Sequence, residues 1–211
     1  MKRHLEVSAF ILAGGASSRM GRDKALLPFG GEPLILKTAR LLEALVRDVT
    51  VIGEPSRYAE LGIRALPDRF VGAKPGERAQ TPLVGIVTAL SAGEARSNLM
   101  LACDLPYLTA EWLDWLIDRA EKSGAQILMP RTENGIEPLA AVYQRECLAP
   151  ILGAWEKGVR SVKDAVSQLR IESCSENEWA SLDPSRRVLK NMNRPEDYQE
   201  AKEWLESYGK A

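Results

Sequence analysis

The sequence has few of the residues that most often carry acid–base and redox chemistry. Its 211 residues include one histidine, His4, and three widely spaced cysteines without a C-x-x-C pair, Cys103, Cys147 and Cys174. A lone histidine near the amino end, where we expect a frayed segment, argues against a Ser-His-Asp triad, a histidine-rich metal site and a histidine general base. The cysteine pattern argues against a zinc knuckle or redox motif and favours a reducing, cytoplasmic setting. Chemistry is therefore left to carboxylates, lysine, arginine and backbone amides.

An excess of charge and a long hydrophobic run are also missing. Lys and Arg number 28 against 29 Asp and Glu, so the formal charge is −1 and no global basic field would hold nucleic acid or anionic lipid. The longest apolar stretches, such as 9–13 and 99–102, fall far short of the roughly 20 residues of a membrane span. With 45% hydrophobic residues, the chain is expected to form a single soluble domain over 1–211, with neither nucleic-acid nor membrane partner.

The hydrophobic pattern alternates between the periods of strands and helices. Residues 7–13 form an apolar run that ends in glycine, and Ile35, Ala39, Leu42 and Val46 form one helical stripe in the segment 33–46. Further strands are expected at 49–52, 63–66, 98–102, 127–129 and 139–143, and further helices from 82, after 109, at 146–155 and at 195–208. The region 157–193 favours neither. This alternation predicts an α/β fold, an open sheet whose ligands lie outside the carboxyl ends of its strands.

The segment 12–24, LAGGASSRMGRDK, predicts a phosphate cradle. Glycines let backbone N–H groups approach an anion, and the nearby cations Arg19, Arg22 and Lys24 add charge-assisted hydrogen bonds. The segment is not a P-loop, because five residues separate Gly15 from Gly21 and Arg22 follows, and it contains no G-x-G-x-x-G. An ordinary glycine-rich turn with solvated cations is the plainer alternative, but the length of the loop favours function.

Two aspartates follow predicted strands. Asp104 would stand at the same sheet edge as the glycine loop, where a carboxylate can hold Mg²⁺ together with substrate phosphates. A turn or helix-capping role is the alternative for Asp104, and the pairing with a basic loop favours the metal. Asp68 opens a polar, Gly/Pro-bearing connection, 68–80, that we interpret as a functional loop and a candidate lid.

At these residues the sequence resembles the molybdenum cofactor guanylyltransferases, a family of nucleotidyltransferases. The matching segments span nearly the whole chain in the family's order: 12–34, 67–68, TPLVGI (81–86), CDLP (103–106), EPLAAVY (137–143), 158–161 and NMNRPEDY (191–198). The resemblance implies a Rossmann-like, mostly parallel sheet in a three-layer α/β/α arrangement. It also implies GTP and Mg²⁺ as ligands and molybdopterin as acceptor, with the guanine dinucleotide cofactor and pyrophosphate as products.

The resemblance also implies residue roles. The residues expected to bracket the nucleotide are Leu12, Ala13, Gly14 and Gly15. Arg19 and Lys24 would contact its phosphates and, with Asp104, form the catalytic set; Asp68 would serve the nucleoside and Asp104 the metal. The residues expected to face the pterin or help the metal are Arg160, Asn191 and Asn193. Molybdoenzyme chaperones or insertion proteins are the expected protein partners.

Two departures from the family's pattern affect the nucleotide. Thr81 stands where the family often has glycine, and Ile52-Gly53 offers no clear counterpart to an asparagine that the family has near the end of its second strand. LAGG, instead of the LAAG of related cytidylyltransferases, favours GTP over CTP. The alternatives are a cytidylyltransferase or sugar- or polyol-phosphate nucleotidyltransferase, and a GTP-binding accessory protein that delivers cofactor without catalysis.

Overall fold

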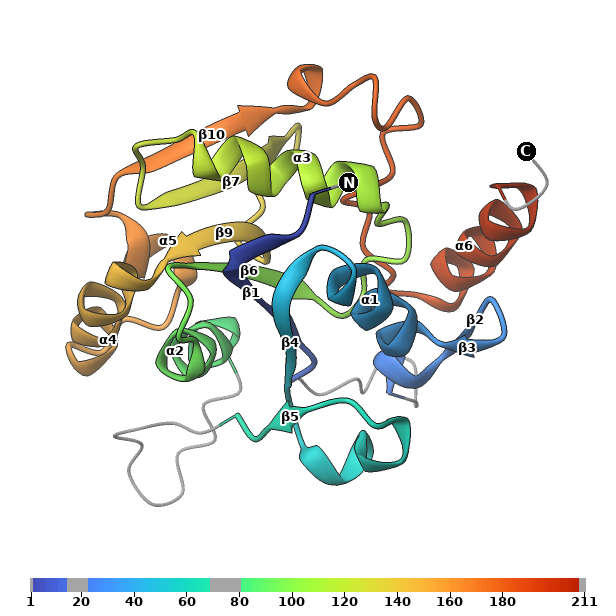
Figure 1. The fold of residues 1–211 in the computed structure, drawn as a ribbon, viewed down its shortest axis with the longest axis horizontal. Helices are drawn as coiled ribbons and strands as arrows, with labels where there is room; N and C mark the ends of the chain where they lie inside the picture. Colours follow the sequence, from blue (N-terminus) through green and yellow to red (C-terminus); the bar gives the residue numbers. More distant parts are fainter. Residues whose placement is uncertain (1, 15–22, 69–80, 209–211) are drawn as a thin grey trace.

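The computed structural model describes residues 2–14, 23–68 and 81–208. Within these ranges an eight-stranded mixed sheet has the order β10-β7-β9-β6-β1-β4-β5 (Figure 1). The short strand β8 pairs with β7 beside this path. Its strands are β1 (His4–Leu12), β4 (Val46–Ile52), β5 (Ala65–Leu66), β6 (Ser97–Ala102), β7 (Ile127–Thr132), β8 (Gly135–Ile136), β9 (Ala140–Gln144) and β10 (Ile171–Ser175). The predicted α/β class is confirmed.

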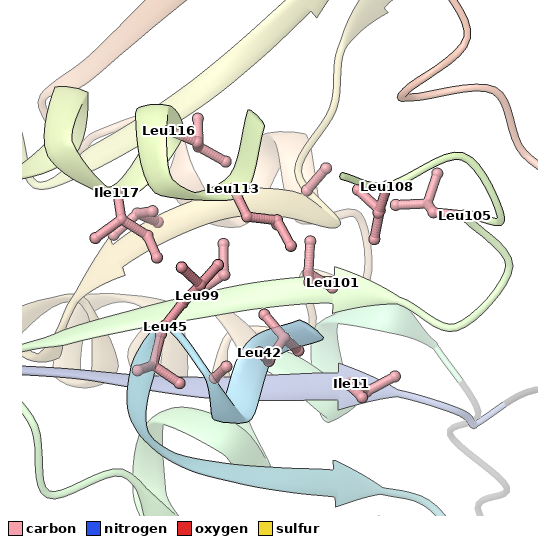
Figure 2. Packing of buried hydrophobic residues seen from close by; sticks show 14 of the residues in the cluster. Ile11, Leu42, Leu45, Leu99, Leu101, Leu105, Leu108, Leu113, Leu116 and Ile117 are labelled. Atoms are coloured by element: carbon pink, nitrogen blue, oxygen red, sulfur yellow. The ribbon is translucent and has the colours of Figure 1, made fainter. Parts of the chain in front are cut away.

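Helices cover both faces of the sheet, so the domain has three layers (Figure 1). The flanking helices are α1 (Leu34–Glu43), α2 (Pro82–Ala92), α3 (Ala110–Glu121), α4 (Leu148–Glu156) and α5 (Val162–Val166). Alternate residues of β1 enter two hydrophobic clusters, Ile11 facing α1 and α3 and Phe10 facing α2 and α4. Figure 2 shows Ile11 in the first cluster, together with Leu42 of α1 and Leu113 of α3. A strand buried on both faces explains the nearly continuous apolar run.

Strand direction gathers several loops at one edge. β1 runs parallel to β4 and β6, and β4 parallel to β5, whereas β9 runs antiparallel to β6 and β7. The ends of four parallel strands (Leu12, Ile52, Leu66 and Ala102) therefore meet the start of β9 (Ala140) at one edge, called the rim below. Ligands of open α/β sheets bind at such an edge.

The last helix, α6 (Pro195–Tyr208), packs on the hairpin of β2 (Pro28–Phe29) and β3 (Glu32–Pro33), far away in sequence (Figure 1). The hydroxyl of Tyr198 donates to the carbonyl of Pro28 over 2.6 Å. Met192, just before the helix, is buried, so this packing fixes the path of residues 191–193. No helix in the described ranges is long and apolar enough to cross a membrane.

Most predicted elements are present, with shifted ends. The helical stripe ends sooner than predicted: α1 stops at Glu43, and Val46 begins β4. Val46 can serve the strand because it pairs with His4 of β1. The undecided region 157–193 contains α5 and β10, and β10 adds a parallel edge strand beside β7.

His4 corrects the expectation of a frayed amino end. It begins β1, is 1% exposed, and donates its backbone N–H to the carbonyl of Leu45 over 2.6 Å. Its ring lies between two carboxylates of α3, with Nε2 2.8 Å from Asp114 and Nδ1 3.0 Å from Glu121. These contacts hold the start of β1 in place, so the segment at His4 is ordered and buried and does not fray. At ~3.3 Å per residue, His4 lies about 26 Å from the rim.

Candidate active site

The rim brings the glycine loop and the Asp104 turn side by side. Ala13 donates its N–H to the carbonyl of Ile52 over 2.8 Å, and Cys103 donates to the carbonyl of Leu12 over 3.2 Å. Both turns therefore begin on a backbone that the parallel sheet holds in place. As the sequence predicts, the start of the glycine loop and Asp104 share one sheet edge.

Lys24, Asp104 and Asn193 meet at this edge and are called the rim cluster. Lys24 Nζ lies 3.4 Å from Asp104 Oδ2 and donates to Asn193 Oδ1 over 2.7 Å. The backbone N–H of Met192 donates to the carbonyl of Asp104 over 2.9 Å, which ties the third segment to the second. The Lys24 and Asp104 side chains are 15% and 20% exposed. Three segments far apart in sequence thus place a cation, a carboxylate and an amide together.

The Asp104 carboxylate lies in an environment that disfavours its charge. Burial raises the pKa of Asp104 above its ordinary value, and Lys24 opposes that shift only in part. An ionised carboxylate that is short of positive charge is stabilised by a second cation. Mg²⁺ typically takes one or two carboxylates and completes its shell with phosphate oxygens and waters, so the Asp104 carboxylate and the nearby Asn193 amide oxygen fit this ion.

Gly14 and Asp68 lie in contact on the β4–β5 side of the rim. A Cβ added at Gly14 would lie 3.0 Å from Asp68 Oδ2, so a larger residue here would require the Asp68 side chain to shift. The hydroxyl of Thr88, on α2, lies 3.5 Å from Asp68 Oδ1. Burial raises the pKa of Asp68, and the contact with Thr88, which lowers it, offsets only part of this shift. Leu12 packs beside Gly85 of the same helix. Leu12, Gly14 and Asp68, three of the residues predicted to bind the nucleotide, therefore lie on one side of the rim.

The two departures from the family pattern also lie on this side. A Cβ at Gly53 would lie 3.2 Å from a ring carbon of Tyr58 and 3.4 Å from the carbonyl oxygen of Ala13. Tyr58 therefore fills the space beside Gly53, the region in which the family has its asparagine. Tyr58 is fully buried. Thr81 precedes α2, and its buried hydroxyl has no hydrogen-bond partner within the described residues.

A pocket of about 230 Å³ opens on the other side of the rim cluster. Asp104, Asn191 and Asn193 line it. The acceptor role of the two asparagines stays a prediction. Glu137, before β9, lines it too and had no predicted role of its own. The signal available in the sequence was its place in the EPLAAVY segment.

Arg160, another predicted site residue, lies away from the cluster. Arg160 lies between α4 and α5, where its guanidinium stacks 3.8 Å over the ring of Trp155 and donates to the carbonyls of Trp155 and Val159. Its role toward an acceptor stays a prediction. Gly15, Arg19 and the candidate lid after Asp68 lie outside the described residues.

Two solved structures have the same fold as this chain. The chain matches molybdopterin-guanine dinucleotide biosynthesis protein A from Archaeoglobus fulgidus with a TM-score of 0.79 at 21% identity, covering 95% of this chain and 99% of that one. It matches a nucleotidyl transferase from Methanothermobacter thermautotrophicus with a TM-score of 0.69 at 18% identity, covering 96% and 98%. The fold is that of the nucleotidyltransferases.

Sequence comparison defines the family. Residues 9–171 match the MobA-like NTP transferase domain, so the chain belongs to this family. A probable molybdenum cofactor guanylyltransferase of Pelotomaculum thermopropionicum is 30% identical over 96% of this chain and 95% of its own length. A relative of the same name from Synechococcus elongatus is 33% identical over 92% and 97%.

Proposed function

We propose that the chain transfers GMP from GTP to the terminal phosphate of molybdopterin, forming the guanine dinucleotide cofactor and pyrophosphate. The observation that carries the proposal is the rim cluster, where Lys24, Asp104 and Asn193 lie beside the start of the glycine loop. The names of the full-length relatives agree with this reaction.

The chemistry requires alignment and charge stabilisation more than proton transfer. A phosphate monoester has a second pKa of about 6, so the attacking phosphate oxygen is already anionic at neutral pH and needs no general base. It attacks the α-phosphorus of GTP, and the bond from that phosphorus to the bridging oxygen of the leaving pyrophosphate breaks. The single histidine, at the far end of β1, is not required.

Different residues among those that the structure describes would align the substrates and stabilise the developing charge. Lys24, oriented by Asn193, would place a positive charge between the two phosphates, which reduces their repulsion and stabilises the leaving group. Asp104, with Asn193 or Asn191 beside it, would hold Mg²⁺, which when bound withdraws charge from phosphate oxygens. Gly14 would give the nucleotide close access to the backbone, and Asp68 would bind its nucleoside part. The phosphate contact of Arg19 remains part of the proposal.

The test is a panel of substrates. The purified chain is incubated with molybdopterin, Mg²⁺ and each of the four nucleoside triphosphates, and products are identified by mass. We expect the guanine dinucleotide with GTP and one pyrophosphate per product. A cytidine product, or turnover only with a phosphorylated sugar or polyol, would favour the other nucleotidyltransferases. GTP binding without any product would favour the accessory role.

A further inference from the structure

Glu137 stands where two pockets meet. The first is the pocket of about 230 Å³ that reaches Asp104, and the second, of about 490 Å³, reaches Trp179 and Lys190. Glu137, Leu189 and Asn191 line both. A ligand with its phosphate at the rim cluster would therefore pass Glu137 as it extended into the larger pocket.

The backbone holds Glu137 firmly. Its N–H donates to the carbonyl of Pro130 on β7 over 2.9 Å, and its carbonyl accepts from Ala140 at the start of β9 over 3.2 Å. The position of the side chain at the pocket wall is therefore determined by the antiparallel part of the sheet.

The carboxylate of Glu137 has few partners. The hydroxyl of Thr132 donates to Oε1 over 3.4 Å, and no ion pair to Glu137 exists among the described residues. Burial raises its pKa, with Thr132 opposing that shift. A partly dehydrated carboxylate that faces a pocket is stabilised by a ligand that brings N–H donors.

Glu137 also lies on the opposite side of the rim from Gly14 and Asp68. Asp68 follows β5 and Glu137 precedes β9, and β4, β1 and β6 lie between these strands. At ~4.8 Å per strand, β5 and β9 lie about 19 Å apart in the sheet. With the nucleoside at Asp68 and the reacting phosphates at Asp104, Glu137 faces the acceptor.

We propose that Glu137 recognises the heterocycle of the acceptor, its two carboxylate oxygens accepting from the amino group and the ring N–H of a 2-amino-4-oxopyrimidine edge. The identity of this acceptor as a pterin rests on the proposed function. The two donors of that edge are parallel and adjacent, which matches a carboxylate. Guanine presents the same edge, so the test must distinguish the two.

The experiment compares pterin with lumazine, in which a carbonyl oxygen replaces the amino group. Binding of each free heterocycle is followed by its fluorescence, without GTP, to wild type, Glu137→Gln and the control Glu43→Gln, which removes one exposed carboxylate on α1. Wild type and control should prefer pterin by about tenfold or more, the scale of one charge-assisted hydrogen bond. Glu137→Gln should lose or reverse this preference, because an amide can donate to the lumazine oxygen and accept from its ring N–H.

Each outcome decides the proposal. An equal pterin-to-lumazine ratio in wild type and Glu137→Gln, or no saturable pterin binding to wild type, would overturn it. GTP and ITP differ only in the guanine amino group, so a changed ratio of their affinities in Glu137→Gln would assign Glu137 to the nucleobase instead. Because each ratio is measured within one variant and without turnover, a chain that transfers no GMP still gives a result, and reduced folding does not mimic one.

Discussion

Two charged clusters lie at opposite ends of β1, and they differ in how the fold treats their carboxylates. At the amino edge, Glu121 accepts from Lys2 over 3.0 Å and contacts His4 over 3.0 Å. Burial disfavours its charge, but the contacts from Lys2 and His4 outweigh burial and lower the pKa of Glu121. At the rim, burial of Asp104 outweighs Lys24, and the pKa of Asp104 rises.

The pKa shifts of Asp104 and Glu121 have opposite directions, which distinguishes the proposed site from the amino-edge cluster. A lowered carboxyl pKa means that the folded state stabilises the ionised group, whereas a raised pKa means that folding with the charge in place costs free energy. The ionised form of Glu121 is thus stabilised within the fold. Asp104 would be stabilised by a ligand that brings positive charge, as the proposed metal and phosphate site would require.

The largest expected effect is at the rim. Asp104→Asn should lower turnover by about 100-fold or more at saturating Mg²⁺, the scale of removing one main electrostatic element. The same change should leave the Tm of the ligand-free protein equal or slightly higher, because it removes a charge that folding disfavours. Initial rates and thermal melts test this together. Near wild-type turnover would refute the role of Asp104, and a clear fall in Tm would refute the contrast between the clusters.

At the amino edge, Gly93→Ala should destabilise the fold by about 2–3 kcal/mol and leave turnover per folded molecule unchanged. A Cβ at Gly93 would lie 2.2 Å from Oδ1 of Asn98, which is fully buried. Urea unfolding measures the loss. Gly124→Ala is the control, since nothing lies within 4 Å of the added Cβ. Asn98→Ala should rescue Gly93→Ala; without rescue, the clash is not the cause.

Gly14→Ala tests the rim without changing a charge. The added Cβ would press on Asp68 at 3.0 Å, so we expect the KM for GTP to rise by about tenfold while the KM for the acceptor stays within twofold. Steady-state kinetics with each substrate varied in turn gives both constants. An equal rise in both would mean that Gly14 serves the whole rim and not its nucleotide side.

The smallest effect is expected at Glu121. Glu121→Gln should reduce the free energy of unfolding by about 1 kcal/mol at pH 7, with unchanged kinetics. Because the folded pKa of Glu121 is lowered, its contribution is present above the ordinary value of 4.5 and is lost as pH falls through the folded value. The difference between the two proteins in urea should therefore stay constant from pH 7 down to the ordinary pKa of 4.5 and shrink as the pH falls below it. A difference that does not shrink below pH 4.5 would mean that packing, and not the ion pairs, links Glu121 to β1.

Local patterns predicted much of the fold. The apolar run before Gly14 indicated β1, the stripe of Ile35, Ala39 and Leu42 indicated α1, and Thr109 indicated the start of α3, where its hydroxyl accepts from the N–H of Trp112. These features depend on neighbours within a few residues. The stripe extended wrongly to Val46 because an apolar residue suits the next strand as well as another helical turn.

Contacts between residues far apart in the sequence could not be predicted from local patterns. His4 was expected to fray, because nothing near it in sequence announces that Asp114 and Glu121 will meet its ring. Tyr58 and Glu137 had no predicted role, since each acquires its surroundings from remote segments. The sequence predicts Asp104 and Asn193 as site residues in two distant segments, and only the fold brings them to one lysine.

The sequence by itself determined which segments become strands and helices and which turn carries the glycines, because periodicity and glycine chemistry act over a few residues. Only the tertiary structure decided which charges share an environment. Whether folding raises or lowers the pKa of a carboxylate depends on its burial and on the partners that the sheet brings to it from distant parts of the chain. At the rim these partners are Lys24 and Asn193, which meet beside Asp104.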